Sequence, residues 1–257
     1  MATASQLLEK YQQGDINLLV LPEMAFTEGY VFKSKEEIEP FLEDEETGPS
    51  VQWAKSQAIR LSCFVMVGYP QRGKGKLTEF LNPPGKLKIL KEHDYNSICF
   101  INPQGERVLT YQKSFLYETD ESWASEGPGF VSTKIEGLGQ VGFGICMDLN
   151  PYQFKTSFYQ FEFANYHLQH QTDLIVCSMA WLKGSGEDST VEYWASRLLP
   201  LCSKTNPTLL VVCNRTGSER GSEFAGSSCV LNIYEEKFKL LGQLKREAAV
   251  LWIKTEQ

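Results

Sequence analysis

Short apolar runs alternate with polar or helical stretches along most of the 257-residue chain. The runs are rich in Val, Ile, Leu, Cys and Phe, which is typical of strands that are buried on both faces. They predict strands over residues 17–21, 63–69, 95–101, 108–112, 140–145, 174–178, 209–214, 227–231 and 249–253. Strands of this kind, separated by helical stretches, indicate an α/β protein with mixed sheets covered by helices.

Three of the intervening stretches carry helical patterns, over residues 50–61, 152–169 and 190–205. The first follows Gly48-Pro49, and Ser50 is placed to cap its N-terminus. A tight turn is predicted between strands 95–101 and 108–112, because Pro103 presets one turn residue and Gly105 supplies a positive φ.

Residues 71–93 differ from the rest of the chain, because they are rich in Gly, Pro and Lys and interrupt the strand pattern. A stretch of this length and composition indicates a long surface insertion. No repeat and no linker divides the sequence, so we expect one domain over residues 1–257.

Composition excludes several classes of function. A net charge of −7 argues against a nucleic acid or an anionic membrane as partner. No apolar run reaches the ~18 residues of a membrane span, and the first fifteen residues lack the apolar core of a secretory signal.

The seven cysteines lie mostly in apolar runs without a CxxC pair, which indicates buried free thiols in the cytoplasm. The three histidines show no metal-site spacing, so we expect no metal and no cofactor.

Cys146 is the cysteine whose position differs from the others. In GFGICMDLNPYQF an apolar strand ends at Cys146, and Pro151 opens the next segment. A side chain at such an elbow lies at the sheet edge beside backbone N–H groups that could hold an oxyanion, as a nucleophile requires. On position alone, one more buried cysteine is the commoner interpretation.

Two charged residues also lie at predicted strand ends. Glu23 ends the run INLLVLPE, which brings a carboxylate to the edge where α/β folds bind ligands. Lys113 ends strand 108–112 among aromatic residues, where an ammonium could stabilise a developing anion. Taken singly, each is more often a solvated surface charge. The histidines are poorly placed to assist a cysteine, so a carboxylate or a lysine must be considered as its partner.

Taken together, the three motifs LLVLPEMAFTEGY, LTYQKSFLYETDESW and GFGICMDLNPYQF resemble the nitrilase superfamily of carbon–nitrogen hydrolases. CSMAWL, CNRTG and FAGSSCVLN extend the resemblance over nearly the whole chain. Asn150-Pro151 stands where many nitrilase relatives have Arg-Phe, which resembles the branch of fungal-type protein N-terminal asparagine/glutamine amidohydrolases.

The resemblance implies an α-β-β-α sandwich and the deamidation of an N-terminal Asn or Gln, with release of ammonia, feeding the N-degron pathway. It assigns Cys146 as nucleophile, Glu23 as general base and Lys113 as the oxyanion stabiliser, together with the backbone N–H of Met147. Glu121 corresponds to the family's second glutamate, which positions substrate and holds Lys113. Asp120 and Glu118 are adjacent candidates for that role.

The sequence gives weaker evidence for the residues that bind the substrate. The α-ammonium of a free N-terminus requires a carboxylate, and Asp148 lies in range, although a structural aspartate explains it equally well. Trp181, after CSMA, is expected to line the site or to fill the core behind it.

One departure and two alternatives remain. The family's opening strand is missing before SQLLEKYQQGD, and its loss would expose a sheet edge and lower stability or activity. The chain could instead be a small-molecule ω-amidase, and Arg215 facing the pocket would favour that reading. The third possibility is an inactive nitrilase-like binding protein.

Overall fold

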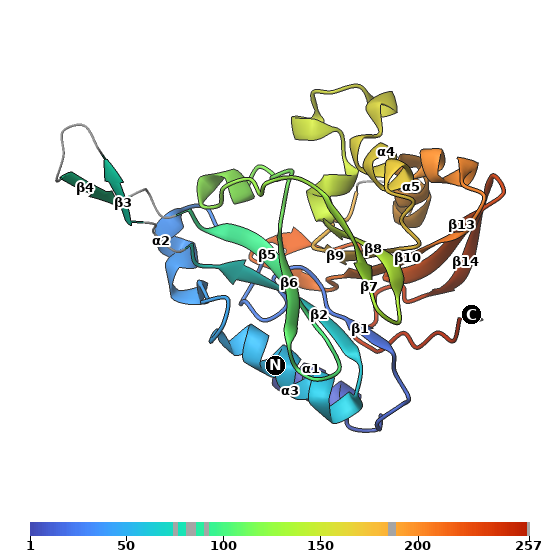
Figure 1. The fold of residues 1–257 in the computed structure, drawn as a ribbon, viewed down its shortest axis with the longest axis horizontal. Helices are drawn as coiled ribbons and strands as arrows, with labels where there is room; N and C mark the ends of the chain where they lie inside the picture. Colours follow the sequence, from blue (N-terminus) through green and yellow to red (C-terminus); the bar gives the residue numbers. More distant parts are fainter. Residues whose placement is uncertain (74–76, 81–85, 90–92, 185–188, 256–257) are drawn as a thin grey trace.

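Two β-sheets pack face to face between two layers of helices (Figure 1). The computed structural model describes residues 1–73, 77–80, 86–89, 93–184 and 189–255. This is the α-β-β-α sandwich expected from the sequence. Among the described residues, no helix has the length and apolar character needed to cross a bilayer.

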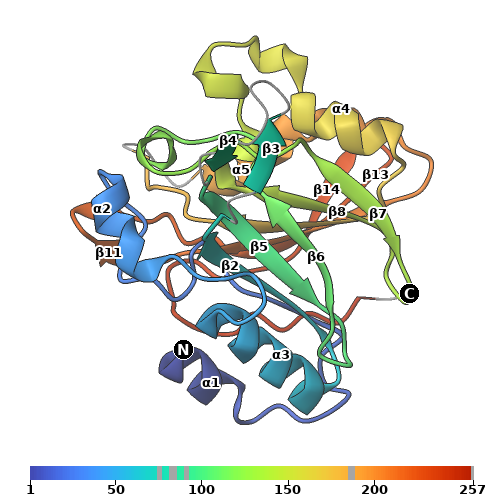
Figure 2. The same cartoon turned by 60° about the vertical axis from the view of Figure 1, so that its left-hand side comes forward.

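The first sheet has the strand order β1-β2-β5-β6. Its strands are β1 (Leu18–Val20), β2 (Phe64–Gln71), β5 (Tyr95–Ile101) and β6 (Arg107–Gln112). β1 runs parallel to β2, and the other pairs are antiparallel. Helices α1 (Ala2–Leu8) and α3 (Pro49–Leu61) cover its outer face (Figure 2).

The second sheet has the order β14-β13-β10-β9-β8-β7. Its strands are β7 (Val131–Ile135), β8 (Gly139–Ile145), β9 (Leu174–Met179), β10 (Thr208–Asn214), β13 (Cys229–Tyr234) and β14 (Lys237–Gln243). The central strands β8, β9 and β10 are parallel, so their carboxyl ends meet at one edge. Helices α4 (Glu162–Gln169) and α5 (Thr190–Arg197) lie on the outer face of this sheet (Figure 1).

The remaining elements are short. They are α2 (Lys35–Ile38), β3 (Leu77–Phe80), β4 (Lys86–Ile89), β11 (Ser218–Glu219), β12 (Ser222–Glu223) and the 3-10 turns η1 (Glu39–Phe41), η2 (Asp120–Ser122), η3 (Cys146–Leu149), η4 (Tyr152–Phe154), η5 (Phe158–Gln160) and η6 (Leu199–Ser203).

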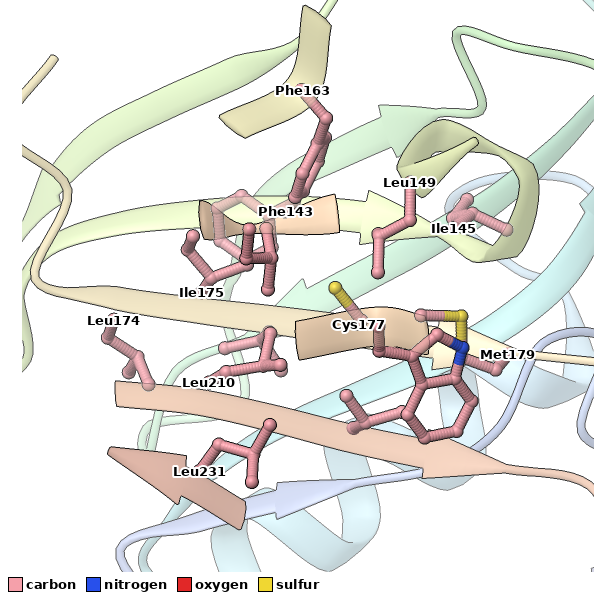
Figure 3. Close-up of a cluster of buried hydrophobic side chains, with 14 of the residues drawn as sticks. Phe143, Ile145, Leu149, Phe163, Leu174, Ile175, Cys177, Met179, Leu210 and Leu231 are labelled. Atoms are coloured by element: carbon pink, nitrogen blue, oxygen red, sulfur yellow. The ribbon is translucent and has the colours of Figure 1, made fainter. Parts of the chain in front are cut away.

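Alternating side chains of β8 join the two halves of the core. Phe143 faces inward and meets Phe100 of the first sheet, with ring centroids 5.1 Å apart. Gly144 faces outward, and a Cβ there would lie 2.8 Å from the ring of Phe163 on α4. Figure 3 shows Phe163 reaching down from α4 towards β8, beside Cys177 of β9. The end of β8 is therefore fixed from both faces.

Most of the predicted strands are present within a few residues of the expected bounds, and the turn at Gly105 (φ +80°) is confirmed. The strand predicted over 249–253 is wrong, because that segment lies outside both sheets. The predictions missed β7 and β14, two sheet-edge strands whose sequences, VSTKI and KFKLLGQ, mix polar with apolar residues. The hairpin β3–β4 lies within the predicted insertion, part of which falls outside the described residues.

The helix predictions need three corrections. The helix expected over 152–169 is confined to α4, because Gln153, Phe154 and Phe161 adopt positive φ and leave only the short turns η4 and η5 before it. The helix expected from Thr190 ends at Arg197, three residues before Pro200. α3 is capped at Gly48 with Pro49 in its first turn, while Ser50 is bound by Glu43.

Candidate active site

Glu23 is placed by close backbone packing at the end of β1. A Cβ on Gly68 of β2 would lie 2.7 Å from the Cα of Glu23, so the glycine allows the two segments to touch. Behind this turn, a guanidinium N–H of Arg215 donates to the carbonyl of Glu23 at 3.2 Å and to that of Met24. These contacts fix the direction in which the Glu23 side chain leaves the strand.

Lys113 follows β6 and is completely buried. Its backbone N–H donates to the carbonyl of Asn96 on β5, which continues the sheet pairing. Its Nζ atom lies 2.7 Å from Oε1 of Glu23 and 2.6 Å from Oδ2 of Asp120. An ammonium buried this deeply requires such partners, because the interior disfavours an unpaired charge.

The acidic partner of Lys113 is Asp120, and the expectation that Glu121 holds it is wrong. Asp120 is buried, whereas Glu121 is exposed. Both lie in the turn η2, where neighbouring side chains leave in different directions. Asp120 is held in turn by the backbone N–H of Tyr117, at 3.0 Å.

Sequence reasoning missed two further residues of this network. Asn96 donates through Nδ2 to Oε1 of Glu23 at 2.7 Å and to Oδ1 of Asp120 at 3.1 Å. The Tyr30 hydroxyl donates to Oδ2 of Asp120 at 3.1 Å. A polar residue inside the apolar run YNSICFI was the available signal for Asn96, since a buried amide requires partners.

Cys146 lies at the elbow predicted for it. β8 ends at Ile145, and Cys146 adopts φ +39° as the first residue of η3. Positive φ is uncommon for a residue other than glycine and marks a constrained turn. Met147 follows as the second residue of η3, so its N–H is one of the initial donors of a helical turn without a partner in that turn.

Asp148 is a structural residue, and its predicted contact with a substrate ammonium is wrong. It is fully buried and does not line the cavity described below. Its carboxylate accepts hydrogen bonds from the backbone N–H groups of Ser114, Phe115 and Ile145 and from the Tyr111 hydroxyl, at 2.8–3.1 Å. Burial raises its pKa to about 6, while these hydrogen bonds oppose the shift. Asp148 thereby ties the segment after Lys113 to the residue before Cys146.

Burial and neighbouring charges shift the pKa values of Glu23, Lys113 and Cys146. Burial raises the pKa of Glu23, and the neighbouring ammonium of Lys113 opposes that shift. Burial alone would lower the pKa of Lys113, but Asp120 and Glu23 raise it well above its ordinary value. Burial, followed by the charge of Glu23, raises the pKa of the Cys146 thiol. At neutral pH the site therefore holds the Cys146 thiol and the Lys113 ammonium, beside a carboxyl group whose pKa is raised by burial.

A cavity of about 450 Å³ opens above Cys146. Its described lining consists of Tyr30, Tyr117, Cys146, Met147, Asn150, Phe154, Ala180, Trp181, Leu182, Lys183, Gly184, Ser189, Thr190, Tyr193, Ala225 and Arg246. Met147 and Trp181 are both among these lining residues. Arg215 is not in this lining but is buried behind Glu23, so the observation that would favour a small-molecule amidase is absent.

The arrangement suits acyl transfer through sulfur. Oε2 of Glu23 has no hydrogen-bond partner within the described structure, so it is available to take a proton. The ammonium of Lys113 beside it is available to stabilise negative charge on a substrate oxygen. No three His, Cys, Asp or Glu side chains in the described ranges are grouped to hold a metal ion.

Comparisons with known proteins show the family of this chain. The sequence model of the carbon-nitrogen hydrolase family matches residues 1–253. A protein N-terminal amidase of Schizosaccharomyces pombe is 37% identical over 93% of this chain and 87% of its own length. The protein N-terminal amidase of Saccharomyces cerevisiae is 33% identical over 66% of this chain, which spans 37% of that longer protein.

Solved structures show the same fold. A crystal structure of an N-terminal amidase with an Asn-Glu-Ala peptide superposes with a TM-score of 0.76 at 21% identity, over 95% of this chain and 89% of the other. The protein therefore belongs to the carbon-nitrogen hydrolase family.

Proposed function

We propose that this protein is an N-terminal amidase, which hydrolyses the side-chain amide of an N-terminal Asn or Gln to the acid and releases ammonia. The observation that carries the proposal is that the paired Glu23 and Lys113 lie close enough to Cys146 to act on its pKa, while Cys146 itself lines the cavity. The names of the fungal relatives, of which one is 37% identical along 93% of this chain, support the choice of substrate.

In the first half-reaction, the Cys146 thiol gives its proton to Oε2 of Glu23 while the sulfur bonds to the amide carbon. Negative charge moves to the carbonyl oxygen, where Lys113 and the N–H of Met147 stabilise it. The protonated Glu23 then gives the proton to the amide nitrogen, the C–N bond breaks, and ammonia leaves. The acyl group remains on Cys146 as a thioester.

In the second half-reaction, Glu23 takes a proton from water, and the resulting hydroxide attacks the thioester carbon. The C–S bond breaks, the sulfur recovers the proton, and the new carboxylic acid leaves. A raised Glu23 pKa suits a group that must both accept and donate a proton near neutral pH.

The α-ammonium of the substrate requires acceptors other than Asp148. The described cavity lining offers the oxygens of Tyr117, Asn150 and Tyr193. Tyr193 donates its hydroxyl proton to Oδ1 of Asn150 at 2.7 Å, which leaves the lone pairs of the Tyr193 oxygen for an incoming donor. The new acidic N-terminus would be a substrate of the N-degron pathway in the cytoplasm.

Mass spectrometry of short peptides tests the proposal. Peptides beginning with Asn or Gln should gain the mass difference of deamidation, while the same peptides beginning with Ala or carrying an N-acetyl group should not. Equal rates on free and acetylated peptides would contradict specificity for an N-terminus. Absence of deamidation on every peptide, by a chain shown to be folded, would contradict the activity itself.

A further inference from the structure

The residues that line the cavity are buried at its floor and exposed at its mouth. At the floor, Cys146, Met147 and Ala180 are buried. At the mouth, Lys183 and Arg246 are exposed. Of the described residues that line the cavity, these two are the charged ones, and both are cations.

Glu223 holds the two cations side by side. Nζ of Lys183 lies 3.1 Å from Oε1 of Glu223, and an Nη atom of Arg246 lies 3.0 Å from the same oxygen. The side chains of Lys183 and Arg246 nevertheless remain 37% and 49% exposed. Within the described residues the two cations share one carboxylate, and their exposed side chains keep N–H donors free for a ligand.

We propose that this cationic mouth, Lys183 and Arg246, selects substrates with a carboxylate on the residue that follows the deamidated one. The inference rests on the proposed function. With the amide of the first residue at Cys146, the peptide must leave through the mouth, which brings the second side chain to the cations. An acidic second residue would pair with them, whereas a basic one would be repelled.

A carboxylate at this position could have two sources. One is the acidic side chain of a peptide's second residue, and the other is the α-carboxylate of free asparagine or glutamine. The open, exposed mouth favours the peptide, since a chain must continue into solvent. Substrates that carry only one of the two carboxylates separate these sources.

The experiment compares kcat/KM for C-terminally amidated peptides that begin Asn-Glu, Asn-Gln and Asn-Lys and are otherwise identical. At low ionic strength we expect Asn-Glu to exceed Asn-Gln by about threefold and Asn-Lys to fall below Asn-Gln by a similar factor. Both differences should shrink as salt shortens the screening length. Free glutamine, compared with glutaminamide, tests the second source.

Single substitutions locate the effect. Lys183→Gln and Arg246→Gln should each lower the ratio of kcat/KM for Asn-Glu to kcat/KM for Asn-Gln. Glu223→Gln removes the competing carboxylate and should raise the preference. Lys134→Gln is the matched control, since Lys134 is an exposed lysine on β7, outside the cavity lining.

The outcomes separate the two proposals. If no peptide is deamidated, the proposed function fails. If Asn peptides are deamidated but Asn-Glu, Asn-Gln and Asn-Lys react equally at low salt, the cationic mouth is not a selector and this inference is overturned. Preference for free glutamine over every peptide would assign the mouth to the α-carboxylate and also overturn it.

Discussion

Nζ of Lys113 lies 2.7 Å from Oε1 of Glu23, although 90 residues separate the two in sequence. Asn96 donates to that same oxygen, whereas Oε2 has no hydrogen-bond partner within the described structure. One oxygen of the carboxylate is thus used to hold its position. The other is the oxygen that the proposed mechanism uses for proton transfer with Cys146.

Asp120 is expected to be required for activity, because it is the second carboxylate on Lys113. Asp120→Asn should lower kcat by about 100-fold, the size of effect seen when an oxyanion-stabilising group is disturbed. Ammonia release measures it, with circular dichroism to confirm folding. The neighbouring Glu121→Gln is the matched control and should stay within about twofold of wild type, because exposed side chains rarely contribute. Equal losses in both variants would contradict the assignment of Asp120.

The dependence of kcat on pH should show an acidic limb, and kcat should not rise with ionisation of a thiol. The reaction requires ionised Glu23, whose pKa burial raises above 4.5, so kcat falls as pH drops through that raised pKa. Lys113 stays charged and Cys146 stays a thiol across the neutral range, because the pKa of each is raised. A kcat that climbs with ionisation of a thiol near pH 8–9 would contradict proton transfer to Glu23.

Acid should destabilise the fold through His167. This residue of α4 is fully buried, and burial, followed by the charges of His170 and Lys204, lowers its pKa from 6.5 to about 3. Protonation therefore favours the unfolded chain. The contribution to stability is complete above pH 6.5 and falls by about 1.4 kcal/mol per pH unit as pH drops from 6.5 towards 3.

Urea unfolding of wild type and His167→Gln at pH 7 and pH 5 measures this effect. The difference in unfolding free energy between the two proteins should shrink by about 2 kcal/mol at the lower pH. His93→Gln, at an exposed position outside α4, is the control. An unchanged difference between wild type and His167→Gln would show that His167 is not the acid-sensitive group.

Gly68 should be required for the position of Glu23. An added Cβ would lie 2.7 Å from the Cα of Glu23 and from the N of Met24, which are backbone atoms that cannot rotate away. Gly68→Ala should cost about 1–3 kcal/mol, as other overpacked interiors do, and should lower kcat at temperatures where the variant remains folded. Thermal unfolding and ammonia release measure the two effects. Full activity would show that the turn tolerates displacement.

Local pattern predicted the buried part of the fold well. Strands such as β5 and β9 are continuous apolar runs, and burial on both faces requires that composition. β7 and β14 lie at the edges of the second sheet, and their identity as strands depends on the neighbours that they pair with. A short stretch of sequence therefore does not predict such a strand.

The sequence predicted those residues of the candidate site that follow a strand. Glu23, Lys113 and Cys146 each follow a strand. β1 and β6 are the opposite edges of the first sheet and β8 belongs to the second, so the meeting of these residues depends on how the two sheets pack. The choice between Asp120 and Glu121 depended on which residue of a short turn faces inward. The role of Asp148 depended on the backbone N–H groups of Ser114 and Phe115, which are distant in the sequence. Neither feature can be predicted from the spacing of residues along the sequence, because both follow from tertiary packing.

Intact-mass spectrometry of the enzyme during turnover tests the central claim most directly. With an Asn-initiated peptide, rapid acid quenching should trap the protein heavier by the mass of the peptide less ammonia, and digestion should place that adduct on Cys146. Cys146→Ala should form no adduct and release no ammonia while keeping the wild-type circular dichroism. An adduct on another of the seven cysteines, or ammonia release by folded Cys146→Ala, would contradict the account.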